Sequence, residues 1–219
     1  MSFKTKSIIF TALIALSLIF DKTIVIFVSS HRVNALNSFI LLFEESRIAY
    51  LFLGLFSLYL LQKKSGGWLP TMWSGIASAT LTSDILKVII SRPRPYEVLL
   101  INPLSTNNTY SFPSGHTTLL FSIVALLKVT SLAQHKEFKF IKYPWFVYAL
   151  LVAFNRIYLG VHYLSDVLAG AFLGYTIGYI WVTMRDNGML ENNLFKKWWW
   201  LLALLIFLAR ITLINLVYK

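Results

Sequence analysis

Residues 156–184 read RIYLGVHYLSDVLAGAFLGYTIGYIWVTM. It contains the polar residues Arg156, His162 and Asp166, and it then continues as an apolar run to residue 184. A run of about 20 mostly apolar residues is long enough for a helix to cross a lipid bilayer. The stretch therefore predicts a membrane-spanning helix over residues 162–184 whose first turns carry ionisable side chains.

The rest of the chain has the same apolar character. Hydrophobic residues make up 57% of its 219 residues and charged residues 13%, with a mean hydropathy of +0.67. A soluble domain is about half apolar and about a quarter charged. We therefore predict an all-α protein, a polytopic transmembrane helix bundle that forms a single domain over residues 1–219. Its spans are expected at about 7–28, 46–62, 68–91, 115–134, 143–160, 162–184 and 197–217.

Two features of composition narrow the class further. The first span follows Lys4 and Lys6, and no small-residue cleavage site comes after it, so we interpret it as a retained anchor and not as a signal peptide. The chain has no cysteine. Disulfides, thiolate metal sites and a cysteine nucleophile are therefore excluded.

The net charge of +11 is spread over short connections and does not form one basic domain, so we predict no nucleic-acid partner. Most of the basic residues outside the motifs fall on alternate connections between the spans, which the positive-inside rule places in the cytoplasm. These residues are Lys4, Lys6, Lys63, Lys64, Lys136, Lys139, Lys142, Arg185, Lys196 and Lys197. The amino terminus is then inside, and segments 29–46, 92–114 and 156–163 lie on the extracytoplasmic face.

Residues 33–43 lie between the first two spans and repeat apolar side chains at helical spacing. This pattern predicts an interfacial amphipathic helix in the outer leaflet. The alternative is a solvent-exposed loop whose periodicity arises by chance.

A first polar cluster ends the third span, where Lys87 precedes the sequence Arg92-Pro93-Arg94-Pro95. The prolines stop the helix, and residues seven apart lie on nearly one face, so Lys87 and Arg94 can converge on one anion. The alternative interpretation is that Lys87 extends to the interface and the arginines bind lipid headgroups. We predict that headgroup role for Arg92, with a secondary contact to substrate as a further option.

A second cluster, Phe112-Pro113-Ser114-Gly115-His116, precedes the fourth span and predicts a helix start. Backbone amides at a helix amino terminus favour a phosphate, Gly115 allows close backbone approach, and Ser114 offers a hydroxyl donor. A simple capping turn is the alternative. His116 favours the functional interpretation, because capping does not require a histidine.

The third cluster joins Arg156 to His162 and Asp166. The last two are four residues apart, so on a helix they face the same way and the carboxylate can orient the imidazole. An ordinary surface His–Asp pair is the alternative. Across the three clusters, Lys87, Arg94 and Arg156 can neutralise phosphoryl oxygens, while the two histidines and the carboxylate supply a nucleophile, an acid and an orienting group.

The order Lys-x6-Arg-Pro, Pro-Ser-Gly-His, Arg-x5-His-x3-Asp closely resembles the signature of the type 2 phosphatidic acid phosphatase superfamily. The resemblance covers about residues 80–185, and the motif-bearing core extends over about 68–185. It implies a six-helix phosphatase core, to which a seventh carboxyl-terminal span is added here. It also implies that the protein is a phosphoric monoester or diphosphate hydrolase acting on lipids.

The resemblance also implies a role for each motif residue. His162 would attack phosphorus to give a phosphohistidine, oriented by Asp166, and His116 would protonate the leaving oxygen. The phosphate would be bound by Lys87, Arg94, Ser114, Gly115 and Arg156. The residue before Arg156 is usually serine in the family and here is Asn155, which puts a secondary contact in doubt. No metal or other cofactor is expected, since the sequence offers no compact carboxylate cluster.

The expected substrate is a lipid phosphate or diphosphate reached from the membrane. Undecaprenyl diphosphate, phosphatidylglycerol phosphate, phosphatidic acid and lipid A phosphates all qualify, and sequence does not choose among them. The expected partners are this substrate and membrane lipids, with no obligatory protein partner. We expect the protein in the bacterial inner membrane, with its active site facing the periplasm or exterior. Oligomeric state is left open.

Three rival classes share some of these features. Vanadium haloperoxidases have the same motifs but are soluble, which this composition does not allow. A lipid phosphotransferase would pass the phosphoryl group from His162 to an acceptor hydroxyl. A non-enzymatic transporter explains intramembrane charges but not the motif spacing.

The last span begins with Lys196-Lys197-Trp198-Trp199-Trp200, which is typical of a cytoplasmic interface anchor. Arg210 then lies about 20 Å along the helix, deep in the outer half of the bilayer. We predict that it extends to outer headgroups or pairs with a residue such as Asp21. The helix is expected to pack beside the first span, outside the chemistry.

Overall fold

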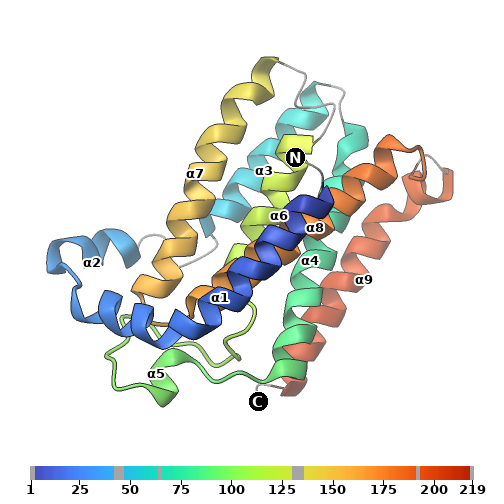
Figure 1. Ribbon diagram of the computed structural model, residues 1–219. Helices are drawn as coiled ribbons and strands as arrows, with labels where there is room; N and C mark the ends of the chain where they lie inside the picture. Colours follow the sequence, from blue (N-terminus) through green and yellow to red (C-terminus); the bar gives the residue numbers. More distant parts are fainter. Residues whose placement is uncertain (1–2, 42–46, 64–65, 130–135, 191–192, 218–219) are drawn as a thin grey trace.

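The computed structural model describes residues 3–41, 47–63, 66–129, 136–190 and 193–217. These residues form α-helices and short 3-10 and loop segments (Figure 1). The long helices are α1 (Phe3–Ser30), α3 (Arg47–Gln62), α4 (Leu69–Ile90), α6 (Gly115–Val129), α7 (Lys136–Tyr158), α8 (Leu164–Asp186) and α9 (Asn193–Val217). The shorter ones are α2 (Asn34–Leu41), α5 (Pro95–Val98) and a 3-10 turn, η1 (Gly66–Trp68). The prediction of an all-α bundle is confirmed.

Each predicted span corresponds to a helix. Three helical segments, Ser7–Ser30, Leu164–Asp186 and Lys197–Val217, are long and apolar enough to cross a membrane by themselves, and α3 and α6 are shorter apolar helices. Large apolar side chains such as Ile19, Leu51 and Ile89 are exposed on the outside of the bundle. Side chains of this kind are stable outside when the surrounding medium is lipid.

Helix α7 differs from its predicted span of 143–160. It starts at Lys136 and passes through Pro144. Hydropathy marks only the apolar part of a helix, so it misses the polar turns that continue the same hydrogen-bonded ladder. The predicted helix within residues 33–43 is present as α2, although the end of that stretch lies outside the described residues.

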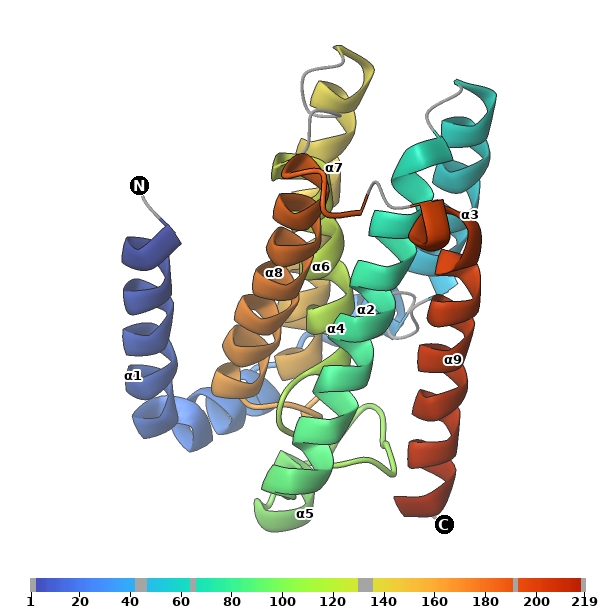
Figure 2. The same ribbon diagram turned by 90° about the vertical axis from the view of Figure 1, so that its right-hand side faces the viewer.

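Helices α6 and α8 lie side by side in the centre of the bundle (Figures 1 and 2). Gly170, Gly174 and Gly178 lie on the face of α8 that contacts α6, and an added Cβ at each would lie under 3.0 Å from atoms of α6 or of Ser114, which directly precedes it. For Gly170 and Gly174 the nearest atoms are the main-chain oxygens of Ser114 and Thr118. Small residues at four-residue spacing let two helix backbones approach closely. This packing fixes the position of the two helix starts that carry polar motifs.

The carboxyl-terminal helix packs against a different partner from the one expected. We predicted that it lies beside the first span, but α9 packs against α4, and α1 packs against α8 and α7. Helices α1 and α9 lie on opposite sides of the bundle in Figure 2. The prediction of this neighbour is wrong, because hydropathy identifies a span but carries no information on which helix it contacts.

Candidate active site

The three polar clusters meet at one end of the bundle. The loop from Ser91 to Ser114 and the turn from Leu159 to Tyr163 lie at the same end as the carboxyl terminus of α4 and the amino termini of α6 and α8 (Figures 1 and 2). Between them is a cavity of about 170 Å³. Its lining is Tyr50, Thr80, Asp84, Lys87, Arg94, Ser105, Asn107, Thr109, Gly115, His116, Leu119, Arg156, Val161, His162, Arg210 and Ile214.

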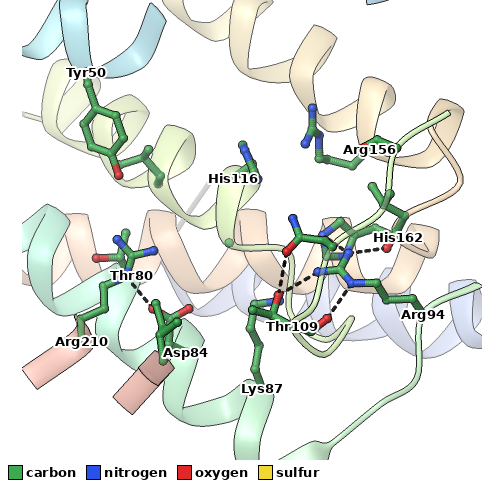
Figure 3. A pocket seen from close by; sticks show the side chains of 16 residues that line it. Tyr50, Thr80, Asp84, Lys87, Arg94, Thr109, His116, Arg156, His162 and Arg210 are labelled. Atoms are coloured by element: carbon green, nitrogen blue, oxygen red, sulfur yellow. Dashed lines mark hydrogen bonds and ion pairs between the residues drawn. The ribbon is translucent and has the colours of Figure 1, made fainter. Parts of the chain in front are cut away.

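The cavity is small. Pockets that enclose a whole drug-sized ligand have about 300–1,000 Å³, so a volume of about 170 Å³ accommodates a small polar group and leaves a lipid tail outside. Figure 3 shows Lys87 entering from one side, with His116 and Arg156 on the opposite side. Cationic side chains thus surround the enclosed space, as the spacing of the motifs predicted.

Lys87 reaches the cavity from the last turn of α4. That helix ends at Ile90 and is capped by Ser91, which has a left-handed backbone (φ 49°) and whose amide donates to the Lys87 carbonyl at 2.9 Å. The ammonium of Lys87 is buried and donates to the Tyr110 carbonyl at 2.7 Å. The loop before α6 therefore holds the lysine in place.

Arg94 is buried, with 2% of its surface exposed, and its guanidinium is held by three hydrogen bonds to neighbouring loops. Nε donates to the Thr109 carbonyl at 2.6 Å, one Nη to the Thr109 hydroxyl at 2.9 Å and the other Nη to the Val161 carbonyl at 2.8 Å (Figure 3). The same Nη is 3.5 Å from Nε2 of His162. Thr109 was not among the predicted site residues, because nothing in the sequence of a polar loop distinguishes a threonine that binds an arginine side chain.

The start of α6 supplies the second cluster. Gly115 and His116 line the cavity as the first residues of the helix. Ser114 is buried behind them: its amide donates to the Asp166 carbonyl at 3.0 Å, and its hydroxyl accepts from Thr117 at 3.0 Å. The predicted helix start is confirmed, and it is tied directly to the start of α8.

His162 and Asp166 face each other at the start of α8. Nδ1 of His162 is 3.5 Å from Oδ2 of Asp166, which is longer than an ordinary hydrogen bond. The carboxylate meanwhile accepts from the Ser111 hydroxyl, from the Tyr163 amide at 2.8 Å and from Arg92 at 2.6 Å. Catalytic hydrogen bonds are often long before substrate binds. Since Nδ1 faces Asp166, Nε2 is the atom that faces Arg94 and the cavity.

The imidazole of His162 is almost fully buried, at 3% exposure. Burial is the main cause that lowers its pKa well below the usual value, and the positive charges of Arg94, Lys87 and Arg156 lower the pKa further. A neutral ring with a free lone pair is therefore the stable form at neutral pH.

Arg92 has a different environment from the headgroup contact we predicted. One Nη donates to Asp166 at 2.6 Å and to Ser165 at 2.7 Å, and the other donates to Asp21 of α1 at 2.8 Å. Its guanidinium also lies 4.0 Å from the ring centroid of Tyr163. The buried carboxylates of Asp21 and Asp166 require a cation, which explains why Arg92 turns inward and joins α1 to α8.

Two more of the predicted site residues, Asn155 and Arg156, lie in the last turn of α7. Arg156, in the last turn of α7, is buried and lines the cavity. Asn155 is also buried, but its amide nitrogen donates to the Ile40 carbonyl of α2 at 2.8 Å. Asn155 thus connects α7 to the amphipathic helix, and its secondary contact with substrate stays a prediction.

The carboxyl-terminal helix contributes to the cavity, although we predicted that it lies outside the chemistry. Nε of Arg210 lies 2.5 Å from Oδ2 of Asp84, and both residues line the cavity with Tyr50 and Thr80 (Figure 3). The predicted pairing of Arg210 with Asp21 is wrong. Asp21 is on the far side of the bundle, where it accepts from Arg92 and from the Ser165 amide at 2.9 Å.

The apolar exterior and the cationic cavity at one end of the bundle define an integral membrane protein with an anion-binding site near the lipid. The family model of the PAP2 superfamily matches residues 68–190, more than half of the chain. The chain belongs to the PAP2 superfamily, and the resemblance identified from the motifs is confirmed.

Solved structures and curated relatives agree with this assignment. The chain superposes on a transmembrane PAP2-type phosphatidylglycerolphosphate phosphatase from Bacillus subtilis with a TM-score of 0.66 and 26% identity, covering 83% of this chain and 94% of that one. It superposes on LpxE of Aquifex aeolicus with a TM-score of 0.60 and 29% identity, covering 75% and 95%. An undecaprenyl-diphosphatase of Sulfolobus acidocaldarius is 24% identical, with 75% of this chain and 78% of the relative aligned.

Proposed function

We propose that this protein hydrolyses a lipid phosphate or diphosphate through a phosphohistidine intermediate, at the extracytoplasmic face of the membrane. The observation that carries the proposal is the cavity, in which Lys87, Arg94 and Arg156 surround the two histidines. Its relatives are named as phosphatases of lipid phosphates, and its apolar exterior gives access to such a substrate from the bilayer.

The geometry suggests an order of events. Nε2 of His162 attacks phosphorus, and the new N–P bond forms as the bond from phosphorus to the lipid-side oxygen breaks. His116 gives that oxygen its proton. A water molecule then attacks the phosphohistidine, His116 takes a proton from it, and the N–P bond breaks to release inorganic phosphate. Lys87, Arg94 and Arg156 stabilise the equatorial oxygens throughout, as preorganised donors that gain strength in a buried site.

The decisive experiment is phosphate release by the purified protein in detergent. The substrates are undecaprenyl diphosphate, phosphatidylglycerol phosphate, phosphatidic acid and a lipid A phosphate, each assayed with excess EDTA. We expect turnover of at least one lipid with EDTA present, because cationic side chains, and not a metal ion, neutralise the phosphate charge in the proposed mechanism. No group of three or more His, Cys, Asp or Glu residues that could hold a metal occurs within the described residues.

Vanadate should compete with the substrate in the same assay, since it adopts the trigonal bipyramid of an in-line displacement. Loss of activity in EDTA that one divalent ion restores would contradict the proposal. Adding a lipid with a free hydroxyl separates hydrolysis from phosphotransfer, because a transferase would yield a phosphorylated acceptor in place of inorganic phosphate.

Orientation is a second prediction, which follows from the distribution of lysine and arginine. Asn107 lies in the loop at the cavity end, and Gln62 lies at the opposite end of the bundle, where α3 finishes. A cysteine at position 107 should react with an impermeant maleimide in intact cells or spheroplasts, and a cysteine at position 62 should react only after permeabilisation. The reverse labelling would place the cavity on the cytoplasmic side.

A third prediction concerns pH and follows from the lowered pKa of His162. In the folded protein this imidazole should stay neutral as the pH falls through 6.5, the usual histidine value. The unfolded chain binds a proton there and the folded chain does not, so the free energy of unfolding should decrease as the pH drops below about 6.5. An NMR titration of the His162 ring, assigned by comparison with His162→Ala, measures this directly. A midpoint at 6.5 or above would contradict the prediction.

A further inference from the structure

The wall of the cavity formed by α3, α4 and α9 contains an ion pair that the proposed chemistry does not use. Arg210 and Asp84 lie 2.5 Å apart, and their side chains are 27% and 9% exposed. Charged residues within membrane helices are costly, and they usually mark a functional site. Tyr50 of α3 also interacts with the Arg210 side chain. The pair therefore needs an explanation beyond the folding of α9.

The position of the pair relates it to the substrate. Thr80, Asp84 and Lys87 recur at helical spacing on α4, so they form one line along the cavity wall. Asp84 is about 4.5 Å further from the end of α4 than Lys87, at 1.5 Å per residue. A lipid substrate keeps its tail in the bilayer. The segment of the headgroup between the reacting phosphoryl group and the tail is therefore the segment that contacts Asp84 and Arg210.

The charge of the cavity indicates what that part is. Four cationic residues line it, namely Lys87, Arg94, Arg156 and Arg210, against the single carboxylate of Asp84, so their formal sum is +3. A phosphate monoester carries about −1.5 to −2 at neutral pH, and a diphosphate carries one further anionic group. An arginine has five donors and suits phosphate oxygens, so it can keep one bond to Asp84 while others point to a ligand.

We propose that Arg210, held by Asp84, binds the second phosphate of a lipid diphosphate and makes the enzyme selective for diphosphates. This inference rests on the proposed function. The bond that breaks joins the terminal phosphorus to the bridging oxygen, and the leaving group is a lipid monophosphate. Arg210 contacts that leaving group and stabilises the charge that develops on it. Asp84 is a positioning residue that orients the guanidinium.

The test compares kcat/KM for a polyprenyl diphosphate and for the monophosphate with the same tail. Removing Arg210 alone would leave Asp84 as an unpaired buried carboxylate that repels every anionic substrate. The informative variant is therefore the double substitution Asp84→Asn with Arg210→Gln, which replaces the ion pair by two uncharged amides. We expect its diphosphate-to-monophosphate ratio of kcat/KM to fall at least about tenfold. Asp84→Asn alone should raise that ratio, because the amide oxygen of Asn can still accept from the guanidinium and orient it, while the negative charge that competes with phosphate is removed.

The matched control is Arg185→Gln. Arg185 stacks on the Trp68 ring at 3.8 Å, at the end of α8 opposite the cavity, so the ratio should not change. An equal decrease of kcat/KM for the diphosphate and the monophosphate in the double variant would overturn the proposal. The ion pair would then have a purely structural role. If the melting temperature shows that the double variant does not fold, the single variant Asp84→Asn provides the test. An unchanged or lower diphosphate-to-monophosphate ratio of kcat/KM in Asp84→Asn then overturns the proposal. Wild-type protein that releases phosphate from neither lipid, nor from any other in the panel, would instead refute the proposed function.

Discussion

Replacing His162 with alanine should reduce turnover by at least about three orders of magnitude, as is typical when a covalent nucleophile is removed. The variant loses the Nε2 atom that faces Arg94 and the cavity. The loss should appear in kcat, because the three cations that we propose as phosphate ligands are unchanged. Rapid quench with labelled substrate should trap an acid-labile phosphoprotein in the wild type and none in the variant.

His31→Ala is the matched control for this experiment. His31 follows the end of α1, is exposed, and has its Nδ1 2.8 Å from the Phe27 carbonyl, so its removal leaves the cavity intact. We expect wild-type turnover and normal phosphoprotein from it. The same acid-labile species in the His162→Ala protein would show that another residue is the nucleophile.

Gly174→Ala should sharply lower the yield and melting temperature of folded protein. A methyl group at this position lies under 3.0 Å from the main-chain oxygen of Thr118 and 3.0 Å from the Ser122 amide nitrogen, where no flexible side chain can move away. Overpacking of a tight contact costs about 1–3 kcal/mol, and separating the two helices also moves both histidine-bearing helix ends. Residual activity per folded molecule should therefore decrease together with stability.

Gly54→Ala is the control, because it adds the same methyl group to a helix. Nothing lies within 4 Å of a Cβ at Gly54 in α3, and alanine is the better helix former. Thermal unfolding of the two purified proteins in one detergent gives the comparison. Equal melting temperatures for the two variants would show that α6 and α8 are not held by this close approach.

Much of the architecture could be predicted from the chain alone. A membrane span needs only a sufficient apolar length, so the helices were identifiable without any tertiary information. Lys87, Arg94, His116, Arg156 and His162 could be grouped because their motifs lie near helix ends that topology places on one face. Side-chain spacing and membrane sidedness thus predicted one shared site.

The wrong predictions for the partners of Arg92 and Arg210 share a physical cause. Arg92 and Arg210 were assigned to headgroups or to the wrong carboxylate because their partners, Asp166 and Asp84, lie on other helices or loops more than 70 residues away in the chain. Such pairs depend on which helices are neighbours. A hydropathy profile records the apolar length of each helix but not which helices are neighbours.

The link between the starts of α6 and α8 has a consequence for how such a protein can diversify. The Ser114 amide donates to the Asp166 carbonyl at 3.0 Å, so the segments that carry His116 and His162 are joined at the cavity end of the α6–α8 pair. Helix α9 packs against α4 at the periphery. Substitutions in α9 can therefore accumulate without shifting His116 and His162, and under the role that we propose for Arg210 the choice of lipid can change over evolution while the reaction stays the same.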